Sequence, residues 1–162
     1  MSLPATQTEL ERIRGECRIM VKNRAFVSAG AATIPVPGAD VLADMAVLST
    51  MLQTINEQFG LSQQDLDQLD PEMRKFALAA AGSIGSKLIG KMITRQLVAL
   101  VFKKFGVRFV SRQVVRFVPL LGQAVAAGLS YGVIARIGYT HIDDCYRVAQ
   151  QVQRALVSVK AE

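Results

Sequence analysis

The chain has 162 residues, of which 51% are hydrophobic and only 6% aromatic, and its formal net charge is +6. This length suits one domain with a sizeable core, and an apolar content made mostly of Ala, Val, Leu and Ile is typical of closely packed helices. Two cysteines without a CxxC spacing exclude a disulfide framework and favour a reducing compartment. The N-terminal residues lack the apolar run of a signal peptide, so we expect a cytoplasmic protein.

The charges are unevenly distributed along the chain. No Asp or Glu lies between Glu72 and Asp143, although eleven Lys and Arg lie in the same stretch. A basic surface permits nucleic acid, anionic lipid or an acidic protein as a partner. Nucleic acid is the least favoured, because no basic motif interleaved with aromatics occurs and the chain has no Trp.

The first helix is predicted over residues 8–31. Thr6 and Glu9 have the spacing of a capping box at its start. Its end is expected before Pro35 and Pro37, because two prolines in three residues cannot continue a helix. The apolar residues that repeat on one face of this helix are Leu10, Ile13, Cys17, Met20 and Val27.

A second helix is predicted from Ala39 to Gln58, opened by Pro37-Gly38 and closed by Phe59-Gly60 as a glycine C-cap. Asp40 suits the positive end of this helix. Asp44 lies deeper and is expected to need a basic partner, because burial of an unpaired charge is costly. Acid/base catalysis by this pair is not favoured, since no nucleophile or substrate pocket accompanies it.

A third helix is predicted to start at Pro71, with Asp70 as its N-cap. It is expected to run through the glycines at 82, 85 and 90 to Phe105-Gly106, followed by a short basic helix over 107–116. The segment Gly85–Met92 nearly matches the phosphate-loop pattern GxxxxGK[ST]. Met92 replaces the required hydroxyl and the preceding residues are predicted to be helical, so close helix packing is the favoured interpretation.

The chain restarts at Pro119 and Gly122, which repeat the Pro…Gly turn of residues 35–38 at an offset of 84 residues. A duplicated helical hairpin would explain this echo. Residues 117–135 carry no charge, a length at the lower limit of a membrane span. A buried helix is favoured over a span because the segment contains Pro, Gln, Ser and three glycines.

The last helix, 139–160, has a heptad seam with apolar residues at steps of three and four. The seam residues are Ile142, Cys145, Ala149, Val152, Leu156 and Val159. His141, Asp144 and Cys145 share one face of this helix, but zinc would need further ligands, and Cys17 is the only other thiol. We therefore predict no metal, no cofactor and no catalytic residue. Strand alternation is not evident, so the predicted fold is an all-α helical bundle of about five to seven helices forming a single domain, 1–162.

The stretch from Ile34 to Leu61, with Pro37-Gly38, Asp40 and Phe59-Gly60, resembles the YcjF-like helical domain family of bacteria, and more distantly the C-terminal helical domain of immunity-related GTPases. The resemblance covers about residues 25–146. It implies a helical module that is associated with GTPases and often with membranes, without established catalytic residues. The chain departs from this family pattern because it carries no attached GTPase domain, which leaves two alternatives: a GTPase partner in trans, or a GTPase connection that has been lost.

Three hypotheses follow for the function. The first is a non-enzymatic interaction module, peripheral on the inner face of the cytoplasmic membrane, that contacts anionic lipid or an acidic protein and acts with a GTPase. The predicted contact residues form rows of basic residues without the acids that usually pair with them; they are Lys87, Lys91, Arg95, Lys103, Lys104, Arg108, Arg112 and Arg116. The second is a soluble module that self-associates through the heptad seam. The third is an integral membrane protein with Gly-rich spans.

Overall fold

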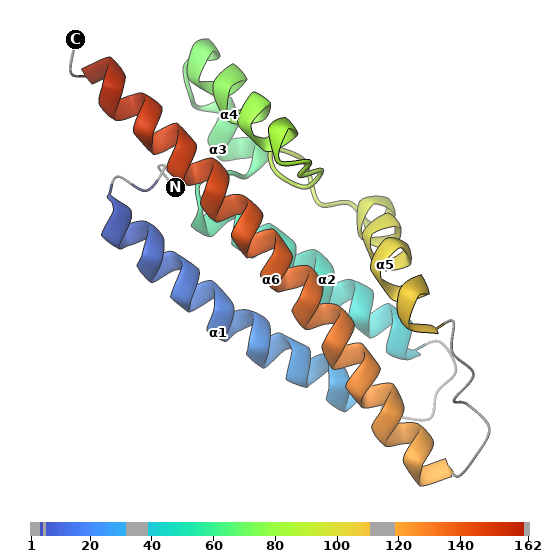
Figure 1. Cartoon of the computed structure of the whole chain (residues 1–162). Coiled ribbons are helices and arrows are strands. Elements are labelled where there is room, and N and C mark those ends of the chain that lie inside the picture. The colour runs from blue at the N-terminus through green and yellow to red at the C-terminus, as the bar shows by residue number, and fades with distance from the viewer. Residues whose placement is uncertain (1–3, 5, 32–38, 111–118, 161–162) are drawn as a thin grey trace. The chain divides into compact units, whose positions relative to one another are not determined.

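The structure is a computed structural model that describes residue 4 and residues 6–31, 39–110 and 119–160. These residues form helices α1 (Gln7–Ala31), α2 (Ala39–Gln58), α3 (Gln63–Asp67), α4 (Pro71–Ser83), α5 (Arg95–Val110) and α6 (Pro119–Lys160) (Figure 1). No strand occurs in the described part of the chain, so the predicted all-α fold is confirmed. The turn residues Pro37 and Gly38, and the basic residues Arg112 and Arg116, lie outside the described ranges.

Short-range chemistry places several helix ends where the sequence predicts them. The Thr6 hydroxyl accepts a hydrogen bond from the Glu9 N–H at 3.2 Å, and the Asp70 carboxylate accepts one from the Met73 N–H at 2.9 Å. Both side chains thereby satisfy a backbone donor that has no partner within its helix. At the end of α2, Gly60 has a left-handed φ of 65°, which confirms the predicted glycine cap.

The third predicted helix is wrong in its length. Helix α4 ends at Ser83, and residues 84–94 form a non-helical connection to α5 instead of continuing through the glycines. Gly85 has a φ of 73°, its N–H donates to the Gly82 carbonyl, and the Ser86 N–H donates to the Ala81 carbonyl. This pair of bonds is the Schellman arrangement that ends a helix, so Gly85 is a cap rather than an interior residue. Helix α5 also differs from the prediction, since it continues through Gly106 to Val110.

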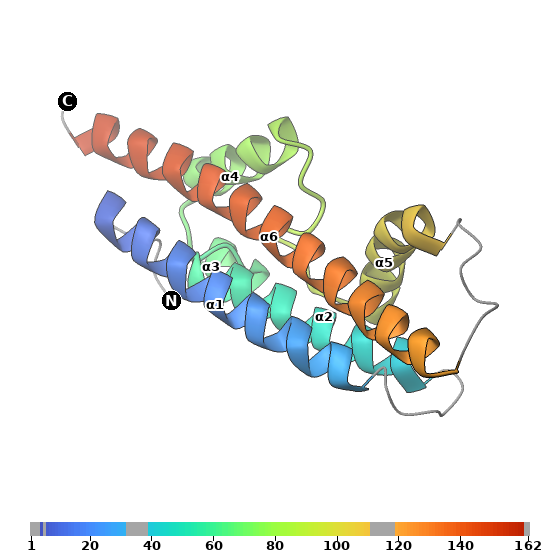
Figure 2. The same cartoon turned by 60° about the horizontal axis from the view of Figure 1, so that its bottom comes forward.

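The internal contacts of the chain divide it into two compact units. Unit 1 consists of Met1–Arg18, Leu52–Met92 and Thr140–Glu162, and unit 2 consists of Ile19–Met51 and Ile93–Tyr139. Helices α1, α2 and α6 therefore contribute residues to both units (Figure 2). The predicted single domain over residues 1–162 stays a prediction, and each unit is described by itself.

Each unit has its own apolar core. The buried apolar residues of unit 1 come from α1, α2, α3, α4, α6 and the turn after α2; they include Leu10, Cys17, Leu52, Ile55, Phe59, Leu66, Ala77, Ile142, Val148 and Val152. Those of unit 2 come from α1, α2, α5 and α6 and include Val21, Ala25, Leu48, Met51, Val98 and Ile134. The predicted stripe on α1 is right at Leu10, Ile13 and Cys17, but Val27 is 66% exposed. The buried face continues through Val21 and Ala25, which lie within about 60° of Leu10 around the helix axis, whereas Val27 lies about 100° away from Leu10.

Helix α6 is continuous over 42 residues, whereas the sequence pattern predicts a division near Tyr139. Gly138 lies at that point, and a Cβ built on it would come within 2.7 Å of both Val21 methyl groups. The glycine therefore permits close packing of α6 against α1 in unit 2 and does not break the helix. Among the described residues, we find no helix that is long and apolar enough to cross a membrane.

Candidate functional site

The exposed side of α5, in unit 2, is basic and partly apolar. The Thr94 hydroxyl caps the helix by accepting a hydrogen bond from the Leu97 N–H at 3.2 Å, a cap that was not predicted from the sequence. Helix α5 contains no Asp or Glu. Val98 is fully buried, whereas Leu100 is 66% exposed. The exposed basic side chains on α5 are Arg95, Lys103 and Lys104.

The structure does not place the predicted basic residues in continuous rows along one helix. Lys87 and Lys91 are exposed, but they lie in the non-helical connection in unit 1, so they do not form a helical row with Arg95. The reason is the Gly85 cap, which ends the helix before the row begins. Arg108 lies on α5, although its side chain is outside the described set. The described basic face therefore consists of the three exposed α5 residues.

The excess of positive charge belongs to unit 2. By sequence, unit 2 has nine Lys and Arg against two Asp, a formal charge of +7, whereas unit 1 has ten Lys and Arg against eleven Asp and Glu, a formal charge of −1. The two acids of unit 2 are Asp40 and Asp44, and Asp44 is only 5% exposed. The side chain of Asp40 lies outside the described set. Unit 2 is thus a strongly basic body with one of its two acids buried.

Asp44 accepts hydrogen bonds from two serine hydroxyls inside unit 2. Its Oδ1 accepts from the Ser28 hydroxyl of α1 and, at 2.7 Å, from the Ser130 hydroxyl of α6. The two hydroxyl oxygens are 3.1 Å apart. The sequence predicts a basic partner for Asp44, and the structure shows hydroxyl donors from two other helices. Such donors satisfy a buried carboxylate and fix the positions of the helices that carry them. Pro119 and Gly122, the other predicted turn residues, begin α6, and their side-chain surroundings are outside the described set.

A second buried polar cluster lies in unit 1 and centres on Asn56 of α2. His141 Nε2 donates to Asn56 Oδ1 at 2.9 Å, and the Cys145 thiol donates to the same oxygen at 3.5 Å. The Asn56 amide nitrogen donates to the Leu88 carbonyl at 3.1 Å. This amide therefore joins α2 and α6 to the connection that follows α4. Asn56 was not predicted from the sequence, because nothing local distinguishes it from an exposed polar residue.

The electrostatics of this cluster favour neutral groups. Burial lowers the pKa of His141 to about 4, and burial raises the pKa of Cys145 well above its usual value. Burial also raises the pKa of Cys17 to about 11. Thiols that stay protonated are poor nucleophiles and poor metal ligands. Among the described residues, no group of three or more His, Cys, Asp or Glu lies in an arrangement that could hold a metal ion.

The residues of the predicted seam lie largely in the core of unit 1. Ile142, Cys145, Ala149 and Val152 are at most 2% exposed, and Leu156 is half-buried. The side chain of Val159 is outside the described set. The heptad period therefore matches packing within the chain, and these four residues are not on the surface where a second copy could contact them. The prediction that this seam serves self-association is wrong for them.

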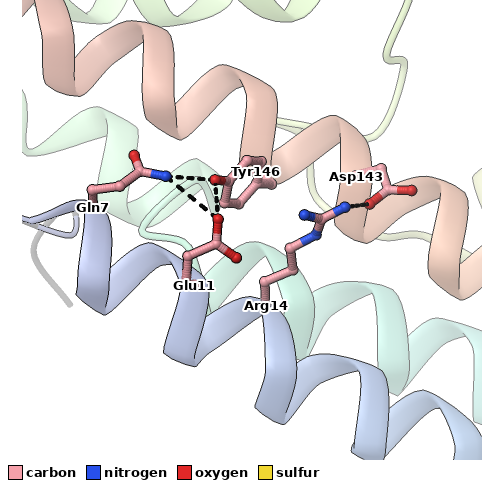
Figure 3. Close-up of polar contacts among 5 residues, drawn as sticks. All are labelled: Gln7, Glu11, Arg14, Asp143 and Tyr146. Carbon is pink, nitrogen blue, oxygen red and sulfur yellow. Dashed lines mark hydrogen bonds and ion pairs between the residues drawn. The ribbon is translucent and has the colours of Figure 1, made fainter.

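A polar network on the surface of unit 1 joins α1 to α6 (Figure 3). The Tyr146 hydroxyl donates to Glu11 Oε1 at 2.5 Å and accepts from the Gln7 amide at 2.6 Å. The Arg14 guanidinium pairs with Asp143 at 2.8 Å and lies 4.7 Å from the centre of the Tyr146 ring. The hydrogen bond to Glu11 raises the pKa of Tyr146. These contacts pair polar and charged side chains of α1 with side chains of α6 within unit 1.

The curated proteins that are similar to this chain include two interferon-inducible GTPases. The chain is 28% identical over 165 residues to interferon-inducible GTPase 5 of Rattus norvegicus and 27% identical to interferon-inducible GTPase 5 of Bos taurus. Each match covers the whole chain but only 35% of the relative, so the chain spans about a third of the length of the relatives it matches. No family profile matches the chain, and no solved structure matches it. The chain is therefore distantly similar to immunity-related GTPases.

Proposed function

We propose that this chain is a non-enzymatic helical interaction module that attaches peripherally to an anionic membrane surface and acts with a GTPase. The membrane contact is assigned to the exposed side of α5 through Arg95, Lys103 and Lys104, with Leu100 between them. The observation that carries this proposal is the charge of unit 2, +7, combined with exposed basic and apolar side chains on one helix that contains no acid. Basic residues near an anionic surface contribute about 1 kcal/mol each, and an exposed apolar side chain adds insertion into the interface.

The GTPase connection is supported by the two relatives, both of which are named as GTPases. It also agrees with the resemblance to the YcjF-like family and to the helical domain of immunity-related GTPases. The buried clusters around Asn56 and Asp44 support a module without catalysis, because side chains that are buried to this extent do not meet a substrate in this conformation. The GTPase is proposed as a partner, either in trans or elsewhere in a longer chain.

Vesicle flotation tests the membrane part of the proposal. The chain is mixed with vesicles of phosphatidylcholine alone or of equal parts phosphatidylcholine and phosphatidylserine, and the bound fraction is measured. We expect binding to the anionic vesicles only, and we expect added salt to weaken it, because salt screens exposed charges. Equal recovery with both kinds of vesicle would contradict the electrostatic contact.

A pair of charge variants tests the assignment to α5. The double variant Lys103→Glu/Lys104→Glu should weaken binding at least about tenfold, since two attractive charges become repulsive. The control is Arg147→Glu/Arg154→Glu, which makes the same change of charge at exposed positions of α6 in unit 1. An equal loss in both variants would show that only net charge matters and would remove α5 from the proposal.

The proposed GTPase partner is tested with a protein encoded next to this gene. If the gene lies beside one that encodes a GTPase, that GTPase is purified and mixed with the chain, and the complex is sought by size-exclusion chromatography with and without GTP. We expect co-elution of the two proteins. Separate elution in both nucleotide conditions would contradict a direct GTPase partner.

A further inference from the structure

The described side chains of α5 divide into an exposed half and a buried half around the helix axis. At about 100° per residue, the exposed side chains all fall within one half of the circumference; they are Arg95, Gln96, Ala99, Leu100, Lys103 and Lys104. Arg95 and Lys104 lie about 180° apart, at the two edges of this half. Val98 is fully buried and lies on the other half, so it fixes which side of α5 faces away from the core of unit 2. Both views place α5 at the edge of the helix segments of unit 2 (Figures 1 and 2).

Two apolar side chains lie between these basic edges. Leu100 is 66% exposed, and its neighbour Ala99 is exposed as well. They lie about 140° and about 40° from Arg95 around the axis, on either side of the centre of the exposed half. Lys103 lies on the same half, one turn further along, and its apolar stem allows its ammonium group to stay in water while the helix touches an apolar boundary. An apolar centre between basic edges is the pattern of a helix that lies in a membrane interface.

The spacing of the basic residues along the axis determines how α5 can lie on an anionic surface. Arg95 and Lys104 are separated by about 13 Å along the axis, at about 1.5 Å per residue. Exposed charges are largely screened from one another beyond about 8 Å at physiological ionic strength. A helix that stands end-on would therefore bring only one of these two charges within range of the surface. A helix that lies flat brings both within range and turns Leu100 toward the surface.

On the basis of the membrane contact proposed above, we infer that α5 lies flat on a loosely packed anionic bilayer and inserts Leu100 below the head groups. Leu100 thereby makes the contact selective for such a bilayer. The basic side chains are complementary in charge to any polyanion, but a soluble polyanion has no apolar region beneath its charges, so Leu100 would gain nothing there. One leucine gains too little to separate tightly packed lipids, so its insertion depends on gaps that loosely packed lipids already contain.

Flotation with two lipid packings tests the selectivity. Vesicles of equal parts phosphatidylcholine and phosphatidylserine are prepared with unsaturated acyl chains, which pack loosely, or with saturated chains below their melting temperature, which pack tightly. The native chain should bind the loosely packed vesicles about tenfold more tightly, and Leu100→Gln should remove this preference, because burial of a leucine side chain changes an affinity by about tenfold or more. The control Ile19→Gln changes a side chain of unit 2 that is 64% exposed, and it should keep the preference. Leu100→Gln should also leave retention on heparin, a soluble polyanion, unchanged.

The outcomes distinguish this inference from the proposed function. A native chain that binds neither kind of anionic vesicle would overturn both. A native chain that binds both kinds equally, or a Leu100→Gln variant that keeps the preference, would overturn the inference and leave the anionic contact in place. Loss of the preference in Ile19→Gln as well would also overturn it, because the preference would then not belong to α5.

Tryptophan fluorescence tests the insertion itself. The chain has no tryptophan, so Leu100→Trp carries a single reporter at the proposed point of insertion. Its emission should shift to shorter wavelength when loosely packed anionic vesicles are added, and lipids that are brominated on their acyl chains should quench it. The matched control is Arg147→Trp at an exposed position of α6 in unit 1, which should show neither effect. Unshifted emission from vesicle-bound Leu100→Trp, or equal quenching of the two variants, would contradict insertion at Leu100.

Discussion

Unit 1 and unit 2 share three of their helices, and both bury apolar side chains, yet they distribute charge in opposite ways. Unit 1 has a formal charge of −1, and some of its surface ions pair within the unit, as in Arg14–Asp143 and Arg74–Asp67. Unit 2 has a formal charge of +7, and one of its two acids is buried between serine hydroxyls. The positive and negative charges of unit 1 nearly cancel, whereas the charge of unit 2 requires counter-charges from solution or from a partner. The difference indicates that unit 2 is the part of the chain that meets an anionic surface.

The buried polar clusters of the two units also differ in the chemical groups that they contain. The cluster of unit 1 consists of an amide, an imidazole and a thiol, all neutral near pH 7 because burial shifts the pKa values of His141 and Cys145 toward their neutral forms. The cluster of unit 2 contains a carboxylate, Asp44. Variants in unit 1 and in unit 2 test whether the two units differ in this way.

The largest effect is expected at Asn56 in unit 1. Asn56→Ala removes the partner of His141 Nε2 and of the Leu88 carbonyl, and it leaves a cavity. The free energy of unfolding should fall by about 2–4 kcal/mol, because buried polar groups without partners carry their full desolvation cost. Asn23→Ala on the exposed side of α1 is the control, and it should change stability by less than about 0.5 kcal/mol. Equal losses in urea unfolding would contradict the role assigned to the cluster.

The next effect is a pH dependence that belongs to unit 1. The only histidine of the chain has its pKa lowered to about 4 by burial, from an ordinary value of 6.5. Between these values the unfolded chain binds a proton that the folded chain does not, so stability should fall as the pH falls from 6.5 toward 4, by up to about 1.4 kcal/mol per pH unit. Urea unfolding between pH 5 and 6.5 isolates this slope, because most carboxyl groups remain ionised there. His141→Gln should flatten it, and an unchanged slope in that variant would assign the pH dependence to other groups.

A packing prediction concerns unit 2. Gly138→Ala would bring a methyl group within 2.7 Å of the Val21 methyls and within 3.0 Å of the Met51 methyl, and Val21 is fully buried. The expected loss of stability is about 1–3 kcal/mol, since overpacking outweighs the better helix propensity of Ala. At Gly132 on the same helix a Cβ would meet nothing within 4 Å, so Gly132→Ala should gain about 0.5–1 kcal/mol. Thermal unfolding of both variants distinguishes the two sites, and a gain at Gly138 would contradict the close contact.

The smallest effect is expected on the surface of unit 1. Tyr146→Phe removes the hydroxyl that donates to Glu11 and accepts from Gln7, while the ring remains next to Arg14. Because these groups are partly exposed and water can replace the lost bonds, the cost should be about 0.5–1 kcal/mol. A loss as large as that of Asn56→Ala in urea unfolding would show that this network contributes as much as the buried cluster.

Helix ends were the most predictable part of the structure. The caps at Thr6, Asp70 and Gly60 depend on residues within one turn of the helix end, so the sequence contains the information needed. Gly85 is different, because a glycine in an apolar run can lie inside a helix or end it. Here the tertiary structure decides: Leu88 and Ile89 are buried, and Asn56 donates to the Leu88 carbonyl. A pattern within one segment does not contain that information.

The seam on α6 shows a second limit of sequence patterns. A heptad spacing predicts that residues such as Ile142 and Val152 pack against another helix, and they do. The spacing does not distinguish a helix of the same chain from a helix of a second copy. The buried clusters were missed for a related reason, because Ser28, Asp44 and Ser130 are separated by up to 102 residues in sequence and meet only in the folded unit. The basic character of unit 2 was predictable, since it follows from composition alone.

Hydrogen–deuterium exchange in the presence of anionic vesicles tests the difference between the units most directly. The exchange of each peptide is compared with and without vesicles of equal parts phosphatidylcholine and phosphatidylserine. We predict slower exchange in α5, over Arg95–Val110, and unchanged exchange in the unit 1 segments of α1 and α6. Protection that is confined to unit 1, or that is spread evenly over both units, would contradict the assignment of the anionic contact to unit 2.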